Sequence, residues 1–316
     1  MSIAVSLSTI AAAMRASNAL LLDLLAEIAF GEDPLDRIIL VTIAQANVQA
    51  LTADLVQLRR YGALDDVPPN EVRHPISIST VSVQTGIAFE TVRRRIRHLN
   101  TLGLCEAGPD GVRITSHMVA RAENLAMLNK TYALVRTLYL RLKANGCLEE
   151  LADRTIPPFA GEPPVRAVSL LAFGHFQRMI AGLVRAIGDL TSALILLATL
   201  RENSEHTAEL PSVVVSMGLM PDDLKVPASV ATIAAVLELS ESTVGRRLTR
   251  LVREGRCLKR KGGVIVATAY VQRPEIMALL EFNYTSLLRL LEPLQQLGVL
   301  SAWDAESDAE PATLLS

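Results

Sequence analysis

The chain has 316 residues, of which 50% are apolar and only 4% aromatic, and its formal net charge is −2. At roughly 150 residues per domain this length predicts two domains, and the composition excludes disordered, collagen-like and low-complexity chains. A nearly neutral chain does not bind polyanions through bulk charge. A core of Leu, Ile, Val and Ala rather than aromatic residues favours helices, so we expect a mainly α fold.

The N-terminal region does not resemble an export signal. Residues 1–30 are apolar but lack a basic start, and three charged residues interrupt them. The uncharged run 190–200 has 11 residues, too few to span a bilayer. The three cysteines are far apart and form no CxxC pair, which is typical of reduced cytosolic thiols. We expect a cytoplasmic protein without a membrane partner.

Helical periodicity and turn residues divide the first half of the chain into a series of elements. They are, in chain order, a helix near 11–29, a short helix at 80–85, a second helix at 89–100, a hairpin over 104–114 and a long helix near 118–144. The helix near 11–29 carries apolar residues on more than one face, and the helix near 118–144 carries them at helical spacing. They are therefore expected in the core or in an interface between chains.

The second half repeats this series. At an offset of 152, residues 79–115 align without a gap on residues 231–267, and ten of the 37 pairs are identical. Upstream, 37–47 aligns on 193–203. The chain therefore reads as a duplication of one unit. The predicted layout is a first unit (1–152), a Pro-rich linker (153–165), a second unit (166–302) and an acidic disordered tail (303–316).

The short helix and the second helix of each unit form a helix-turn-helix. In the second unit, Ser240 is placed to cap a helix over 241–252, in which Val244, Leu248 and Leu251 recur at helical spacing. A turn of three residues separates this helix from the one before it. In the first unit the second helix, over 89–100, has the same layout, with Val92, Ile96 and Leu99 facing inward.

A β-hairpin follows each helix-turn-helix. Asp110-Gly111 and Gly262-Gly263 are the expected two-residue turns. A helix-turn-helix followed by a hairpin is a winged helix, so we expect one at about 74–116 and another at about 225–268.

The second helices resemble those of a known family. Residues 240–251 (SESTVGRRLTRL) and 89–99 (FETVRRRIRHL) resemble the recognition helix of bacterial winged helix-turn-helix transcriptional regulators of the Crp, GntR and MarR kind. The resemblance covers about 40 residues in each unit. One position departs from the family pattern, because Glu238 stands where the first unit keeps the turn glycine as Gly86. That departure puts the turn of the second unit in question.

The resemblance implies double-stranded DNA as the partner, with the second helices in the major groove. The implied base-reading positions are Phe89, Glu90 and Arg94 in the first unit and Glu241, Ser242 and Arg246 in the second. The positions suited to phosphate contacts are Thr91, Thr243, Arg93, Arg97 and Arg250. Arg95 and Arg247 flank the packed face, and for them a structural salt bridge and a DNA contact are equally good interpretations.

The charge is unevenly distributed. Residues 71–115 carry a net +2 and residues 225–267 a net +6, so the remainder of the chain carries −10. The second hairpin contributes Lys259, Arg260 and Lys261, whereas the first carries acidic residues. Basic charge gathered on the expected DNA-facing elements is typical of nucleic-acid binding, and we expect the second unit to dominate the affinity for the DNA backbone.

These observations favour a sequence-specific transcriptional regulator that is not an enzyme and needs no cofactor or metal. No phosphate-binding or hydrolase motif is present, and the five histidines lack metal-ligand spacing. Two alternatives stay open: a winged-helix scaffold for protein–protein contacts, as in chromosome segregation, and a plasmid-type replication initiator. The two units form either an internal pseudo-dimer or a homodimer that associates through its apolar helices. The sequence names no operator and no small-molecule effector.

Overall fold

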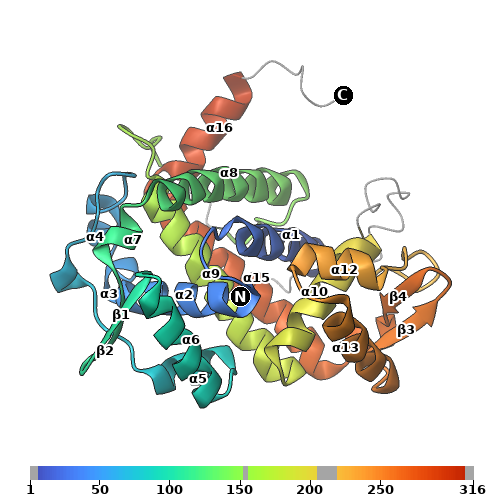
Figure 1. Ribbon diagram of the computed structural model, residues 1–316. Coiled ribbons are helices and arrows are strands. Elements are labelled where there is room, and N and C mark those ends of the chain that lie inside the picture. The colour runs from blue at the N-terminus through green and yellow to red at the C-terminus, as the bar shows by residue number, and fades with distance from the viewer. Residues whose placement is uncertain (1–5, 152–155, 205–218, 310–316) are drawn as a thin grey trace.

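The computed structural model describes residues 6–151, 156–204 and 219–309 (Figure 1). The described residues are mainly helical and contain two two-stranded antiparallel sheets. The expectation of a mainly α fold with two short hairpins is therefore confirmed.

Most elements of the first half recur in the same order in the second. The first half contains α1 (Leu7–Glu27), α2 (Pro34–Asn47), α3 (Gln49–Thr52), α4 (Leu55–Arg60), the 3-10 helix η1 (Asn70–Val72), α5 (Ile78–Thr85), α6 (Phe89–Thr101), β1 (Cys105–Gly108), β2 (Gly111–Ile114), α7 (Ser116–Val119) and α8 (Ala122–Ala144). The second half contains α9 (Val165–Ile187), α10 (Leu190–Ser204), α12 (Val230–Leu237), α13 (Glu241–Arg253), β3 (Cys257–Arg260), β4 (Gly263–Val266), α14 (Thr268–Val271), α15 (Pro274–Gln296) and α16 (Val299–Ala309).

Four long helices form a central bundle in which the two halves interleave. Helix α1 of the first half packs on α8 and also on α15 of the second half, and α9 packs on α15 and also on α8 (Figure 1). The buried apolar side chains of both halves form one continuous cluster. The two units recognised in the sequence therefore share a single core.

Helices α1 and α9 are long and apolar because they lie inside this bundle. By length and composition alone each could cross a membrane, but 56% of the apolar window of α1 and 67% of that of α9 is buried within the fold. The core helix of a soluble protein meets the same criterion. These two helices therefore do not determine where the protein resides.

The Pro-rich segment before α9 is held against the C-terminal end of α15. The Phe159 amide donates to the Gly298 carbonyl at 2.9 Å, and the Arg59 guanidinium lies 5.6 Å from the centre of the Phe159 ring. Residues 156–164 contain no helix or strand, as the prolines predict. Residues 152–155 of the predicted linker lie outside the described residues.

The prediction of a disordered tail from residue 303 is wrong for residues 303–309, which belong to α16. Trp303 is fully buried, and its indole N–H donates to the Tyr132 hydroxyl on α8 at 2.7 Å. Asp304 accepts from the Tyr139 hydroxyl at 2.9 Å and pairs with Lys143 at 2.7 Å. These contacts with α8 stabilise a helix whose acidic composition alone suggests disorder. Residues 310–316 lie outside the described residues.

Candidate nucleic-acid interface

Each half presents a pair of short helices joined by three residues. Helices α5 and α6 are separated by residues 86–88, and α12 and α13 by residues 238–240. The inward faces of the second helices are formed by the predicted residues, namely Val92, Ile96 and Leu99 in α6 and Val244, Leu248 and Leu251 in α13, all of them buried. Ser240 caps α13, as expected, by accepting from the Thr243 amide at 3.3 Å. Burial of these aliphatic side chains fixes which face each second helix turns outward.

The turn between the two helices has the same backbone conformation in both halves. Gly86 has φ 64°, and Glu238, which replaces it in the second half, has φ 51°. A Cβ atom at Gly86 would overlap the Val184 side chain of α9. At Glu238 there is room, and its carboxylate pairs with Arg37 of α2 at 2.6 Å. The departure from the family pattern at Glu238 therefore leaves the turn geometry intact.

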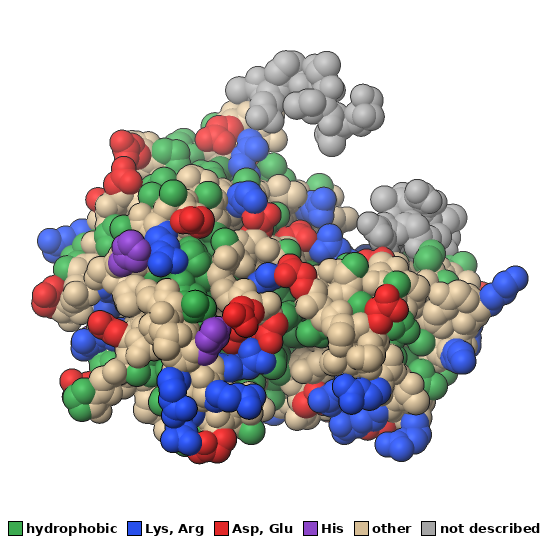
Figure 2. Space-filling view, in the orientation of Figure 1, with side chains coloured by type: hydrophobic (Ala, Val, Ile, Leu, Met, Phe, Trp, Pro, Cys, Tyr) green, Lys and Arg blue, Asp and Glu red, His purple; other side chains and the backbone are tan. Residues whose placement is uncertain are grey.

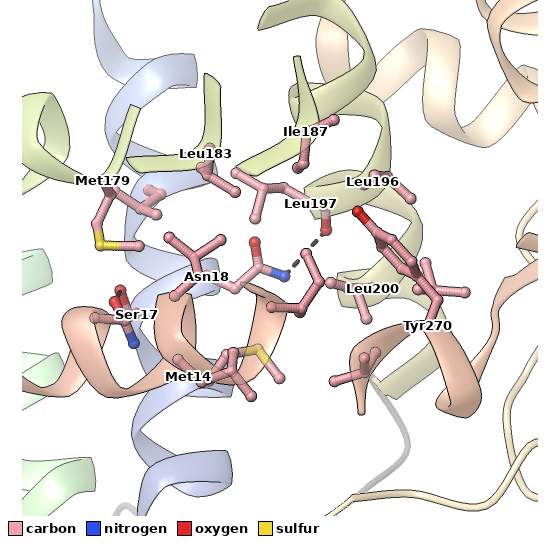
Figure 3. Close-up of a pocket in the computed structure, with 17 residues that line it drawn as sticks. Met14, Ser17, Asn18, Met179, Leu183, Ile187, Leu196, Leu197, Leu200 and Tyr270 are labelled. Atoms are coloured by element: carbon pink, nitrogen blue, oxygen red, sulfur yellow. Dashed lines mark hydrogen bonds between the residues drawn. The ribbon is translucent and has the colours of Figure 1, made fainter. Parts of the chain in front are cut away.

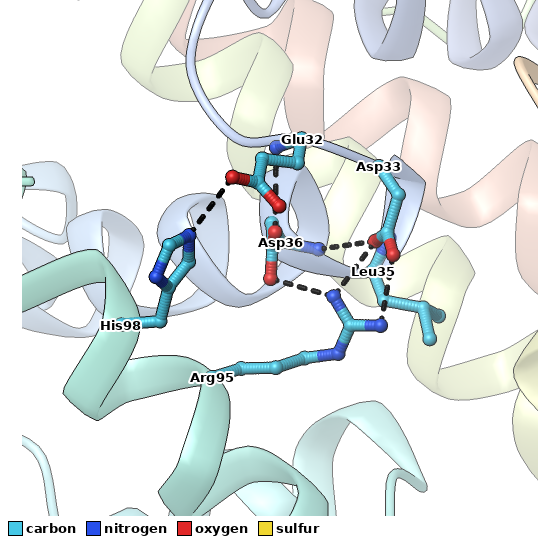
Figure 4. Close-up of polar contacts among 6 residues, drawn as sticks. All are labelled: Glu32, Asp33, Leu35, Asp36, Arg95 and His98. Atoms are coloured by element: carbon cyan, nitrogen blue, oxygen red, sulfur yellow. Dashed lines mark hydrogen bonds and ion pairs between the residues drawn. The ribbon is translucent and has the colours of Figure 1, made fainter.

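Arg95 and Arg247 are structural residues whose ion pairs connect α6 to α2 and α13 to α10. Arg95 of α6 pairs with Asp33 at 2.8 Å and with the buried Asp36 at 2.7 Å (Figure 4). Arg247 of α13 pairs with Asp189, at the start of α10, at 3.2 Å. Burial alone would lower the pKa of Arg95, but the hydrogen bonds to its two carboxylate partners raise the pKa above its ordinary value.

Each hairpin turns one residue earlier than the sequence predicts. The turns are Pro109-Asp110 and Lys261-Gly262, whereas Gly111 and Gly263 are the first residues of β2 and β4. These two glycines are needed for another reason. A Cβ atom at Gly111 would lie 2.6 Å from the Ile76 carbonyl, and Gly263 meets the Ala228 carbonyl in the same way. Ile76 and Ala228 bridge to Val112 and Val264, so each hairpin has a third, very short backbone segment beside it.

A buried asparagine at the end of α2 and of α10 connects each helix to its hairpin, and sequence reasoning missed both. Asn47 donates to the Val112 carbonyl at 3.2 Å and accepts from the Ile114 amide at 2.9 Å. Asn203 makes the same two bonds at the same two distances in the second half. The signal was present, because these asparagines are the last aligned pair of 37–47 and 193–203. Helices α2 and α10 thus belong to the helix–hairpin units, which begin earlier than residues 74 and 225.

The predicted DNA-contact residues lie on the outer faces of α6 and α13 and on the second hairpin. Exposed side chains are those of Phe89, Glu90, Arg93, Arg94, Arg97, Glu241, Ser242, Arg246, Arg250, Lys259, Arg260 and Lys261, whereas Thr91 and Thr243 are half-buried. Figure 2 shows two groups of basic side chains along the lower edge of the view, over the positions that α6 and α13 occupy in Figure 1. The structure therefore turns both second helices toward the same side of the molecule.

The arginines of α6 differ in whether they form ion pairs within the described structure. Arg93 pairs with Glu90 at 2.6 Å, which occupies the carboxylate that the resemblance assigns to base reading. Arg94 and Arg97 have no hydrogen bond or ion pair with any residue that the structure describes. These two guanidinium groups are available for a partner.

In α13 the arginines also divide into engaged and available side chains. Arg250 pairs with Glu254 at 2.6 Å. Within the part of the chain that the structure describes, Arg246 makes a single bond, from its Nε to the Ser242 carbonyl at 3.3 Å, and Arg260 on the second hairpin bonds only to the neighbouring Lys259 carbonyl, at 3.3 Å. Arg246 and Arg260 therefore keep donors that no described residue occupies.

The described residues give little support for a metal site or for a reactive thiol. They contain no group of three His, Cys, Asp or Glu side chains arranged to hold a metal ion. Burial raises the pKa of the Cys105 and Cys257 thiols to about 12, so these cysteines are not reactive thiolates at neutral pH. No family model, curated protein or solved structure matches the chain.

Proposed function

We propose that the chain is a sequence-specific, DNA-binding transcriptional regulator built from a duplicated winged helix. In each half α2 or α10 is the opening helix, α5–α6 or α12–α13 is the helix-turn-helix, and the hairpin that follows is the wing. The observation that carries the proposal is that α6 and α13, in matching positions of the two halves, turn arginine-bearing faces to the same side of the molecule (Figure 2). Exposed guanidinium groups on a helix suit both phosphates and guanine edges.

The two helices are expected to read different sequences. Corresponding outward positions carry different residues in the two halves: Phe89 corresponds to Glu241, and Arg97 corresponds to Thr249. Two recognition helices on one side of a protein contact half-sites about one helical turn apart, near 34 Å. The preferred operator is therefore two unlike half-sites rather than a palindrome.

Fluorescence anisotropy with labelled duplexes of mixed sequence tests DNA binding. Affinity should fall steeply with salt, by about 10³-fold between roughly 50 and 200 mM if six or more phosphates are contacted. The double variant R94A/R97A should lose about tenfold or more in affinity. R60A/R141A, which removes the same charge from exposed positions on α4 and α8, should bind like the unmodified chain. A chain that binds no DNA, or binds without salt dependence, contradicts the proposal and favours a protein-interaction scaffold.

Genome-wide footprinting then separates the two DNA-binding alternatives. Protected sites dispersed among promoters support a transcriptional regulator. Protection confined to a single replication origin would identify a replication initiator instead.

A further inference from the structure

A cavity lies between the first helix–hairpin unit and the central bundle. It encloses about 830 Å³, including its open mouth, and α2, β2, α7, α8 and α9 contribute to its walls. Most of the lining is apolar, with Leu40, Met127, Leu128, Leu170 and Phe173 among the side chains that face it. Apolar walls with a few convergent polar groups are typical of ligand sites.

Two buried arginines line this cavity, and neither has a carboxylate partner among the described residues. Arg73 is 5% exposed and Arg166 is 4% exposed. Arg73 donates to the Ile114 carbonyl at 3.1 Å and to the Ser116 hydroxyl at 2.7 Å, and also to Asn70. Arg166 donates to the Leu64 carbonyl. All of these acceptors are neutral, so among the described residues neither buried cation is hydrogen-bonded to a carboxylate.

Neither guanidinium group has acceptors for all of its N–H donors among the described residues. The Nε atom of each is buried and has no acceptor in the part of the chain that the structure describes. Burial lowers the pKa of both arginines. Nearby acids, Glu106 and Glu71 for Arg73 and Asp65 and Asp66 for Arg166, oppose this shift only in part. A buried cation without a counter-ion is costly, whereas a carboxylate accepts two parallel bonds from a guanidinium.

The second half of the chain provides an internal comparison. Lys225 stands 152 residues after Arg73 and pairs with Asp222 at 2.8 Å, so its charge is matched. The second half has a smaller cavity, of about 620 Å³, with Met14 in its wall and no arginine among its lining residues. Figure 3 shows that cavity, in which apolar side chains surround Asn18 and the Asn18 amide donates to the Leu197 carbonyl. The pair of unmatched guanidinium groups is thus particular to the cavity of the first half.

We propose that the cavity of the first half binds an amphipathic organic carboxylate. Its carboxylate group pairs with Arg73 and Arg166, and its apolar body lies against the aliphatic and aromatic walls. Asn47 and Ile114, which tie α2 to the first hairpin, also line the cavity, so the ligand contacts the helix–hairpin unit and the bundle together. This inference does not depend on DNA binding, and it can fail while the proposed function holds.

Isothermal titration calorimetry with the full chain tests the proposal. The probes are 2-naphthoate and decanoate, two carboxylates of different shape, and 2-naphthamide, the neutral counterpart of the first. We expect saturable binding of at least one carboxylate at one site per chain. The amide should bind about tenfold more weakly than naphthoate or worse, because it cannot pair with the cations. Equal affinity for naphthoate and naphthamide, or binding of neither carboxylate, overturns the proposal.

A variant at Arg166 locates the site. R166M removes the guanidinium group but keeps a long, unbranched side chain, and it should reduce carboxylate affinity about tenfold or more through loss of the charge-assisted pair. R185M changes an exposed arginine on the same helix and should bind like the unmodified chain. Unaltered carboxylate binding by a folded R166M, with its helical circular dichroism retained, contradicts the assignment. Inorganic phosphate should not bind; phosphate binding as tight as naphthoate would make the site one for a small inorganic anion.

Discussion

Arg37 and Glu238 form an ion pair that joins the two halves of the chain, with their closest atoms 2.6 Å apart. The pair requires a glutamate side chain at position 238, where the backbone has φ 51°, a conformation that favours glycine. Removing the Cβ atom relieves this cost, whereas removing only the carboxylate does not. We therefore expect E238G to unfold with about 1 kcal/mol more free energy than E238A. Urea unfolding of the two variants measures the difference. Equal stabilities would mean that the left-handed turn carries no strain.

At the matching turn of the first half, an added methyl group should be far more damaging. G86A combines a left-handed backbone with overlap of its Cβ and the Val184 side chain, so we expect a loss of about 2–4 kcal/mol. Gly103 also has a positive φ, of 70°, but open space surrounds its Cβ position. G103A therefore controls for backbone strain and should cost only about 1 kcal/mol. Thermal unfolding compares the two, and equal losses would argue against a close approach of α9 at Gly86.

Removal of Arg95 should destabilise the first helix–hairpin unit. R95A leaves the buried Asp36 without its cation, which should cost about 3 kcal/mol. In the double variant R95A/D36N the buried charge is gone as well, so part of the stability should return. Chemical denaturation of the two variants measures this recovery. If the double variant is no more stable than R95A, the cost arises from packing rather than from an unmatched charge.

Buried His175 should make stability fall in mild acid. Burial lowers the pKa of His175 to about 3, whereas an unfolded histidine has a pKa near 6.5. The unfolded chain therefore binds a proton that the folded chain excludes, and stability should fall by up to about 1.4 kcal/mol for each pH unit below 6.5. The stability is fully present above that pH and is lost progressively down to about pH 3. Unfolding free energies measured at pH 7, 6 and 5 should drop less steeply in H175N.

The hydrogen bonds around His175 explain why the neutral ring is accommodated. Ser17 donates to the Asn283 side-chain oxygen at 2.7 Å, so its hydroxyl oxygen accepts from His175 Nε2 at 2.9 Å. The other ring nitrogen then accepts from Ser286 at 2.9 Å. Both nitrogens are satisfied by a single proton on the ring. A pH profile of H175N as steep as that of the unmodified chain would place the acid sensitivity elsewhere.

Trp303 should be the main anchor of α16. W303A removes a fully buried indole and should cost about 3–5 kcal/mol. Y132F deletes only the acceptor hydroxyl that receives the indole N–H and should cost about 1–2 kcal/mol. Calorimetric unfolding distinguishes the two. A W303A variant as stable as Y132F would show that α16 contributes little to the fold.

Under the proposed function, the second wing and the second helices should have separable roles. K259A/K261A removes two exposed cations, so affinity should weaken alike for every DNA sequence, and the slope of log affinity against log salt should drop by about 2. R246A on α13 should instead relax discrimination at particular base pairs, by about 1–3 kcal/mol. Competition titrations with mutated duplexes record both effects. A wing variant that changes sequence preference would reverse these assignments.

Local patterns allowed the helix pairs to be predicted. Val244, Leu248 and Leu251 occupy one face of any helix over that segment, so the buried face and the cap at Ser240 follow from neighbouring residues alone. The hairpin turns were misplaced by one residue because Gly111 and Gly263 look like turn residues. Their role is instead to admit the backbone at Ile76 and Ala228, more than 30 residues away in the chain, and no local pattern shows that approach.

Contacts between distant segments could not be predicted. The order of α16 depends on Trp303 and Tyr132, which are 171 residues apart, so composition alone suggested a tail. Helices α1 and α9 carry apolar residues on several faces, and this pattern indicates burial without naming the partner helix. The cavity with Arg73 and Arg166 was missed for the same reason, since its two cations lie 93 residues apart and meet only in the folded chain.

The interleaving of α1 and α8 with α9 and α15 has a consequence for how the two outward helices, α6 and α13, are presented. Two identical subunits separate on dilution and lose their paired surfaces. Here the pairing is covalent, so the spacing between α6 and α13 is the same at every protein concentration. The outward faces of α6 and α13 are also encoded by separate stretches of one gene, so each can change without altering the other. The unequal net charges of residues 71–115 (+2) and 225–267 (+6) illustrate this independence.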